Sequence, residues 1–144
     1  MKIKLPLEKI SIQEDGIHLM VKGEINGTTA TFLVDTGASR TVFDVNRISK
    51  FVCIEETEFE DNENLSAGLG TNSMVSQITT VKELKFGDLH IEDYDVVLLD
   101  LNHVNQSYEQ LELDGIDGVL GSDLMDDYNA VVSYRESYME FSLF

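Results

Sequence analysis

The sequence predicts an all-β domain with one or two short helices. Three observations support this prediction. Apolar and β-branched residues recur in short runs along most of the chain, as in residues 31–34. The two-residue turn signals Asn26-Gly27 and Gly87-Asp88 separate such runs. Only residues 102–113 and 122–130 carry apolar side chains at helical spacing.

Length and composition fit one soluble domain over residues 1–144, since 42% hydrophobic content is enough for a core. The net charge is −17, so we expect neither nucleic acid nor membrane as a partner, because both require cationic surfaces. Cys53 is the only cysteine, and we expect a buried structural thiol. The N-terminus lacks the unbroken apolar run of a signal peptide, which favours a cytoplasmic protein, although a chain trimmed of its leader would look the same.

The first fifty residues should form strands. Residues 3–12 alternate well enough for one strand, and Pro6 confines that strand to a sheet edge or a strand start. Asn26-Gly27 predicts a hairpin between the next two runs. Residues 40–43 continue as an extended segment, and residues 44–50 fit a short helix or a turn.

The middle of the chain should contain a second hairpin. Residues 55–64 are acidic and predict an exposed strand or loop. Gly87-Asp88 then joins two runs, of which the second ends in a buried stretch at residues 96–99. This arrangement repeats the first half, with Asp100 following the apolar strand. Residues 102–113 fit a short helix or a long loop.

The C-terminal segment should hold a helix and two strands. Residues 122–130 predict a helix that Ser122 or Asp123 caps. Residues 130–144 predict two strands joined near Arg135. Their apolar ending indicates burial in a sheet or in an interface.

Asp35 follows directly after the apolar run 31–34. An Asp is almost never buried unless it is paired or hydrogen-bonded, so Asp35 either caps a turn at the surface or lies in a site that uses its charge. Gly37 allows a tight bend, and Thr36 and Ser39 supply hydroxyl groups that can bond to their neighbours.

Residues 32–39, Phe-Leu-Val-Asp-Thr-Gly-Ala-Ser, resemble the active-site loop of aspartic proteases. The second signature of that family, two apolar residues followed by Gly, is present as Val119-Leu120-Gly121. The chain holds one Asp-Thr-Gly, so it looks like the single-lobe, retropepsin-like branch, in which each of two chains lends one Asp. The resemblance implies a retropepsin-like acid-protease barrel.

The resemblance also implies a role for each residue of the loop. Asp35 from each of two chains would form the catalytic dyad, Thr36 would support the loop across the dimer axis, and Gly37 would bond substrate backbone. Ala38 stands where pepsin-like loops place a Ser whose hydroxyl stabilises the ionised dyad, so we predict a less acidic pH optimum than that of pepsin. Ser39 stands where retroviral enzymes usually carry an Asp, so the resemblance does not predict how this end of the loop binds the substrate backbone.

Residues 65–77 are small and uncharged. The resemblance implies that Gly68, Leu69 and Gly70 form a flap that closes over the substrate, whereas the composition alone fits an ordinary flexible hairpin. The chemistry requires no metal and no cofactor. The three histidines, His18, His90 and His103, show no ligand spacing, which favours surface or structural roles over zinc binding.

The sequence therefore predicts an aspartic endopeptidase that acts on peptides or proteins as a homodimer. The alternative is a non-catalytic peptide-binding or assembly module with the same fold; a strict monomer, with one Asp35, would favour it. Asp123 as a second catalytic acid would let a monomer suffice, although a helix cap is the favoured interpretation. Residues 130–144 are the candidate interface, and self-repulsion should weaken the dimer at low salt. A small acidic β-barrel with both motifs by coincidence is the third interpretation.

Overall fold

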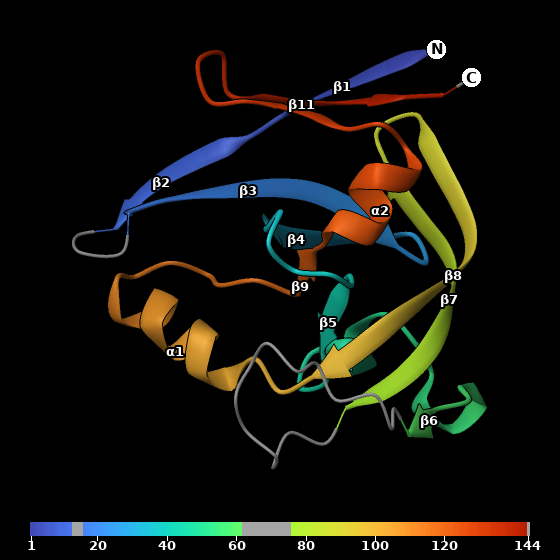
Figure 1. The fold of residues 1–144 in the computed structure, drawn as a ribbon. Coiled ribbons are helices and arrows are strands. Elements are labelled where there is room, and N and C mark those ends of the chain that lie inside the picture. The colour runs from blue at the N-terminus through green and yellow to red at the C-terminus, as the bar shows by residue number, and fades with distance from the viewer. Residues whose placement is uncertain (13–15, 62–75, 144) are drawn as a thin grey trace.

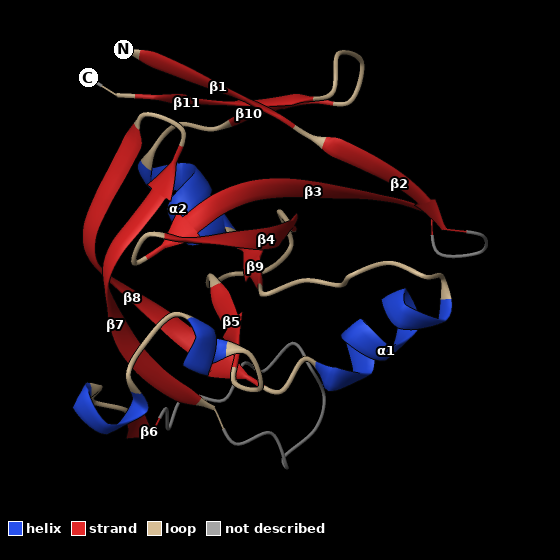
Figure 2. Cartoon of the chain, turned by 180° about the vertical axis from the view of Figure 1, so that it is seen from behind, coloured by secondary structure: helices blue, strands red, loops and turns tan. Residues whose placement is uncertain are grey.

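The computed structural model describes residues 1–12, 16–61 and 76–143, and these residues are mostly in β-strands (Figures 1 and 2). The strands are β1 (Lys2–Pro6), β2 (Glu8–Ile12), β3 (Gly16–Ile25), β4 (Thr28–Val34), β5 (Val42–Asp44), β6 (Glu60–Asp61), β7 (Gln77–Phe86), β8 (Leu89–Leu99), β9 (Gly118–Leu120), β10 (Val131–Ser133) and β11 (Tyr138–Ser142). The helices of the described part are α1 (Asn102–Gln110) and α2 (Ser122–Asp127), with 3-10 turns η1 (Ile48–Lys50) and η2 (Ile54–Glu56). The predicted fold class is confirmed.

The strands form two sheets. One sheet has the order β2-β3-β4-β9-β5-β8-β7-β6, and a further pairing of β3 with β7 closes part of it into a barrel. The other has the order β1-β11-β10 and lies at the top of Figure 1, where the two chain ends lie side by side. The part of the chain that carries Asp35 and the Val119-Leu120-Gly121 motif lies in the larger sheet, since β4 and β9 are neighbours in it.

Both predicted hairpins are present. Asn26 and Gly27 have φ angles of 50° and 84°, which is the turn geometry that hairpins with this dipeptide adopt. Gly87, with φ 59°, opens the turn between β7 and β8. The β3–β4 hairpin therefore delivers the chain directly to Asp35 at the end of β4.

The single strand predicted for residues 3–12 is wrong, because the segment divides into β1 and β2, which belong to different sheets. Pro6 ends β1 opposite Tyr138, and Leu7 donates its N–H to the carbonyl of Ser137. Proline has no N–H to continue a ladder, so the strand stops there and the chain crosses to the larger sheet.

The end of β4 is apolar on both faces because each face packs against a hydrophobic cluster. Phe32 is fully buried in the main core, where its ring contacts those of Phe43 and Phe86 at centroid distances of 5.7 and 5.3 Å. Leu33 points to the other face and packs against a second cluster that includes Val42. A strand that packs against other residues on both faces has a continuous run of apolar residues in its sequence, and such a run precedes Asp35.

The four central strands repeat one arrangement about an approximate twofold axis. β4 runs parallel to β9, β5 runs parallel to β8, and the two inner strands β5 and β9 are antiparallel. Asp35 follows β4, and Asp100 follows β8 at the equivalent position. Each aspartate accepts a hydrogen bond from the amide two residues later, Gly37 for Asp35 and Asn102 for Asp100. The repeat predicted from the sequence is confirmed.

The apolar C-terminal segment is buried in the sheet of its own chain. Met139 and Phe141 in β11 are fully buried, and β11 lies between β1 and β10. Both hydrogen-bonding edges of β11 are therefore occupied within the chain. A partner chain could extend this sheet only at β1 or at β10.

Candidate active site

Asp35 follows directly after β4, the strand labelled in Figure 2; its side chain is exposed, and it lies in a tight turn. Its N–H donates to the Leu120 carbonyl at 3.0 Å, which fixes it to β9. Its carboxylate oxygen Oδ1 accepts the Gly37 N–H at 2.9 Å, and its carbonyl accepts the Ala38 N–H at 3.1 Å. The side chains of Thr36 and Ser39 are also exposed. In the single chain, Asp35 caps a turn and presents its other carboxylate oxygen at the surface.

The apolar-apolar-Gly motif lies directly beside this turn. In the register of β4 and β9, Leu33 is opposite Val119 and Val34 is opposite Leu120. A Cβ on Gly121 would lie 2.6 Å from the carbonyl carbon and oxygen of Arg40, so only glycine fits there. The carbonyl of Ala38 accepts the Ser122 N–H at 2.7 Å. The structure thus brings the two predicted motifs together.

The Thr41–Asp123 pair forms a second connection that the sequence did not indicate. Thr41 is fully buried; its N–H donates to Asp123 Oδ2 at 3.0 Å, and its hydroxyl donates to Oδ1 at 2.8 Å. The same hydroxyl accepts the Gly121 N–H at 3.1 Å. The predicted cap is wrong, since the N-cap residue of α2 is Gly121 and no side chain caps the helix. Asp123 instead binds the end of the segment 35–41, which we call the Asp35 loop.

Two further groups set the electrostatics around Asp123. Arg40 Nε lies 3.7 Å from its Oδ2, with the Arg40 side chain about half exposed. Tyr94 in β8 donates its hydroxyl to Asp127 Oδ2 at 3.3 Å. Burial, followed by the charges of Asp123 and Asp127, raises the pKa of Tyr94 well above its ordinary value. Tyr94 therefore stays a hydrogen-bond donor to α2 at every physiological pH.

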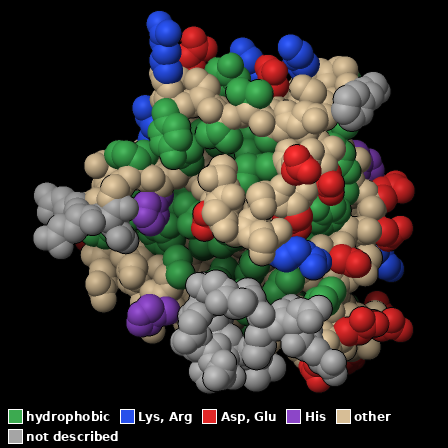
Figure 3. All heavy atoms as spheres, viewed as in Figure 1, with side chains coloured by type: hydrophobic (Ala, Val, Ile, Leu, Met, Phe, Trp, Pro, Cys, Tyr) green, Lys and Arg blue, Asp and Glu red, His purple; other side chains and the backbone are tan. Residues whose placement is uncertain are grey.

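An apolar surface adjoins the Asp35 loop. Leu33 and Val119, neighbours across β4 and β9, are half-buried and pack on the cluster that includes Val42 and Val97. Apolar side chains are visible in the middle of the face seen in Figure 3, interspersed with polar and acidic groups. A carboxylate beside an apolar surface is an arrangement that can bind an extended peptide and hold a water molecule next to it.

Comparisons with known proteins decide the family. The sequence model described as "Aspartyl protease" matches residues 21–124. The chain belongs to the aspartyl protease family. No curated protein sequence matches it significantly.

The fold of this aspartyl protease family member is similar to solved retropepsin-like structures, of which three follow. A retropepsin-like aspartic protease from Rickettsia conorii has a TM-score of 0.59 at 15% identity, over 98% of this chain and 89% of that one. The retroviral protease-like domain of Ddi1 from Leishmania major gives 0.58 at 12%, over 88% and 90%. The EIAV protease, complexed with the inhibitor HBY-793, gives 0.54 at 17%, over 82% and 93%. The predicted retropepsin-like fold is confirmed.

The other half of the fold carries polar contacts at the positions equivalent to Thr41 and to Asp35, namely Asp117 before β9 and Asp100 after β8. Asp117 Oδ2 accepts the Thr31 N–H at 2.8 Å, and its Oδ1 lies 3.5 Å from Arg47 Nη1. The Asn102 N–H, followed by the Asn46 amide, lowers the pKa of Asp100 below its ordinary value. Asp100 is thus held as an anion in a turn of the same form as that of Asp35.

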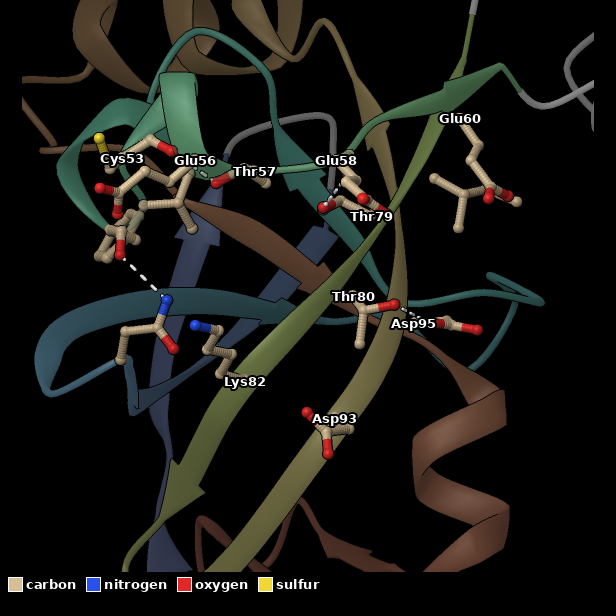
Figure 4. A pocket seen from close by; sticks show the side chains of 14 residues that line it. Cys53, Glu56, Thr57, Glu58, Glu60, Thr79, Thr80, Lys82, Asp93 and Asp95 are labelled. Carbon is tan, nitrogen blue, oxygen red and sulfur yellow. Dashed lines mark hydrogen bonds between the residues drawn. The ribbon is translucent and has the colours of Figure 1, made fainter.

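A separate groove of about 540 Å³ lies between residues 51–60 and strands β7 and β8 (Figure 4). The carboxylates among the residues that line it are Glu56, Glu58, Glu60, Asp93 and Asp95. Cys53 lines it and is exposed, so the prediction of a buried thiol is wrong. Among the described residues of the groove, none belongs to the Asp35 loop or to the Val119-Leu120-Gly121 motif.

The remaining predicted residues are placed as follows. The flap residues Gly68, Leu69 and Gly70 lie outside the described residues. His18 Nδ1 lies 2.7 Å from the Tyr108 hydroxyl, and His90 lies 3.5 Å from Glu83. Within the described ranges, no three His, Cys, Asp or Glu side chains are grouped to hold a metal ion. Neither helix of the described chain is long and apolar enough to cross a membrane.

Proposed function

We propose that residues 1–144 form one retropepsin-like domain that works as an aspartic endopeptidase, with a dyad of Asp35 from two chains. The observation that carries the proposal is the placement of Asp35. Its carboxylate is exposed, yet its backbone is held to Leu120 and its loop to Ser122 by short hydrogen bonds. A catalytic group needs this combination of access and fixed position.

The proposed chemistry needs only the two carboxylates and water. Two close carboxylates share one proton, as in the dyads of aspartic proteases, so one is ionised and the other protonated. The ionised Asp35 takes a proton from water as the water attacks the scissile carbonyl carbon, and the protonated Asp35 gives its proton to the carbonyl oxygen. The C–N bond then breaks as the leaving nitrogen takes the proton from the first Asp35 and a hydroxyl of the intermediate returns a proton to the second. In this proposal Thr36 supports the partner's loop, and Gly37 bonds the substrate backbone. No metal and no covalent intermediate takes part.

The environment of Asp123 favours a dyad made by two chains over one made by a single chain. A second acid within the chain would need a carboxylate free to act. Asp117 and Asp123 each lie two positions from the Val119-Leu120-Gly121 motif. Asp117 accepts the Thr31 N–H and lies beside Arg47, which leaves Asp123. Both of its oxygens accept hydrogen bonds from Thr41, and Arg40 lies beside it. A carboxylate engaged in this way holds structure, so the second catalytic acid comes from a second copy.

The charge distribution supports a contact between two copies at the β1-β11-β10 sheet. Residues 1–12 and 130–144 carry four basic and three acidic side chains, a net charge of +1, whereas residues 13–129 carry 6 basic and 24 acidic side chains, a net charge of −18. Lys and Arg side chains gather at the top of Figure 3, over the β1-β11-β10 sheet. Repulsion between copies is weakest there. Val131 and Tyr134, which are 50% and 57% exposed, supply apolar surface for the contact at the β10 edge.

The substrate class follows from the surface beside Asp35. Leu33 and Val119 offer half-buried apolar contacts, so we propose that the enzyme cleaves extended peptides next to apolar side chains. The acidic surface should favour substrates that also carry basic residues.

Cleavage of a diverse peptide mixture tests the proposal. Wild-type protein at micromolar concentration, at roughly pH 4 to 7.5, should generate new peptide ends that mass spectrometry detects. Activity should rise severalfold from about 0.01 M to about 0.3 M salt, because the Debye length falls from about 30 Å to under 10 Å and the two acidic chains repel each other less.

Sedimentation of the same samples gives the control. The dimer fraction should rise together with activity. Samples that are fully dimeric and cleave nothing would contradict an endopeptidase and support the peptide-binding or assembly module. Activity that is highest in monomeric samples would contradict the two-chain dyad.

A further inference from the structure

We propose that the Thr41–Asp123 pair positions the Asp35 loop for catalysis, and that its loss slows turnover while the fold remains. This inference rests on the proposed function for its catalytic readout. Its structural content, that the pair holds the loop in place, does not depend on activity.

The Thr41 hydroxyl acts both as a donor and as an acceptor. The hydroxyl donates to Asp123 Oδ1 and accepts from the Gly121 N–H, while the Thr41 N–H donates to Asp123 Oδ2. The Thr41 side chain is fully buried, so water does not compete for these groups. Thr41, at the end of the loop, is thereby hydrogen-bonded to Gly121 and Asp123, which both follow β9.

The loop depends on these hydrogen bonds because burial contributes little to its position. Most side chains between Asp35 and Arg40 are exposed, and Ala38 is only half-buried. The loop begins at the Asp35 N–H bond to Leu120 and is held in its middle by the Ala38 bond to Ser122. The Thr41–Asp123 pair fixes its far end. Without the pair, the hydrogen bonds that hold the loop to the other described residues are those of the backbone: Asp35 to Leu120, Ala38 to Ser122, and the Thr41 carbonyl to the Val97 N–H at 3.0 Å.

The ion pair with Arg40 has a smaller effect than the hydrogen bonds. Arg40 Nε lies 3.7 Å from Asp123 Oδ2, and its side chain is 46% exposed. Exposed ion pairs are screened by water and stabilise little. Arg40 therefore serves as a control residue, since its replacement removes a neighbouring charge and leaves the three hydrogen bonds in place.

The other half of the fold has a connection at the equivalent position with the charges arranged differently. Asp117 precedes β9 as Thr41 precedes β5, and Arg47 lies three residues beyond β5 as Asp123 lies three beyond β9. Arg47 Nη1 lies 3.5 Å from Asp117 Oδ1. In each half, a polar pair therefore joins the residue before one inner strand to a residue three positions beyond the other inner strand. The pair near Asp35 consists of a buried hydroxyl and a carboxylate with hydrogen bonds of 2.8 and 3.0 Å, which are shorter than the 3.5 Å contact of Arg47 with Asp117.

Three variants test the inference. Thr41→Val removes the hydroxyl at nearly constant volume, Thr41→Ser keeps it, and Arg40→Met removes only the nearby charge. A misplacement of a catalytic group by about 1 Å lowers the rate by up to about a hundredfold. We expect Thr41→Val to lower kcat at least about tenfold with little change in KM, and the other two to stay within about threefold of wild type.

The pH profile and amide exchange distinguish positioning from simple loss of stability. Two close carboxylates titrate with well-separated apparent pKa values, and a looser loop brings these values together. The active pH range of Thr41→Val should therefore narrow. Hydrogen exchange at Gly121 should also become faster in Thr41→Val, because its N–H loses the Thr41 hydroxyl.

The outcomes separate this inference from the proposed function. An inactive wild type would contradict the proposed endopeptidase activity. Hydrogen exchange alone would then test whether the Thr41–Asp123 pair holds the loop in place. The inference would be overturned if Thr41→Val had the same kcat, the same active pH range and the same hydrogen-exchange rate at Gly121 as the wild type. If Thr41→Val does not fold, Asp123→Asn, which retains one acceptor and the side-chain shape, is measured in the same way; wild-type values in that variant would overturn it equally.

Discussion

Replacing Asp35 with Asn should lower peptide cleavage by roughly 10⁴-fold or more, since removing a central catalytic group has effects of this size. Asn keeps the shape of Asp and an oxygen that can accept the Gly37 N–H, so the turn should survive. It cannot take a proton from water. The turnover number, measured with a peptide identified from the mixture, and the unfolding midpoint together show whether chemistry or structure was lost.

Asp100→Asn is the matched control for this variant. Asp100 ends β8 as Asp35 ends β4, and its carboxylate accepts an amide N–H in a turn of the same form. It lies in the half of the fold to which we assign no catalysis. We expect activity within about twofold of wild type, with a small loss of stability because a hydrogen-bonded anion is removed. Equal losses in both variants would contradict the assignment of catalysis to Asp35.

Replacing Gly121 with Ala should have the second-largest effect, abolishing most of the activity and destabilising the fold. The new Cβ would lie 2.6 Å from the Arg40 carbonyl carbon and oxygen and 3.0 Å from the Ala38 carbonyl oxygen. All three are backbone atoms, so the Asp35 loop itself must move. Overpacking of this kind costs about 1–3 kcal/mol. Urea unfolding and turnover measured on the same sample give both effects.

Gly27→Asn provides the comparison. Gly27 has φ 84°, a Cβ there would meet no atom within 4 Å, and Asn tolerates this backbone better than other residues. We expect near-wild-type activity and a stability loss below about 1 kcal/mol. A Gly121→Ala variant as stable and active as Gly27→Asn would contradict the close contact between β9 and the loop.

The sequence was informative where a local pattern determines structure. Asn26 and Gly27 predict their hairpin because they accept positive φ, and the run before Asp35 predicts a buried strand because the end of β4 packs against a hydrophobic cluster on each face. The two family motifs then placed Asp35 and Gly121 near each other, as the structure does.

The sequence was uninformative where a residue's role depends on a distant partner. Asp123 at the start of a helix has the local pattern of a cap, yet its carboxylate binds Thr41, 82 positions earlier in the chain. Pro6 marked an edge or a strand start, but the division of residues 3–12 between two sheets depends on β11, at the other end of the chain. Cys53 is exposed and lines a groove together with residues of β7, which follows much later in the chain. Local patterns do not encode such pairings.

A mixing experiment tests the two-chain dyad most directly. Wild type and Asp35→Asn are combined at constant total concentration, allowed to exchange subunits, and assayed for peptide cleavage. If each active site needs Asp35 from both chains, activity follows the square of the wild-type fraction, and an equal mixture retains about a quarter of the wild-type rate. A linear decline, with about half the rate in the equal mixture despite demonstrated exchange, would show that one chain suffices and would contradict the account.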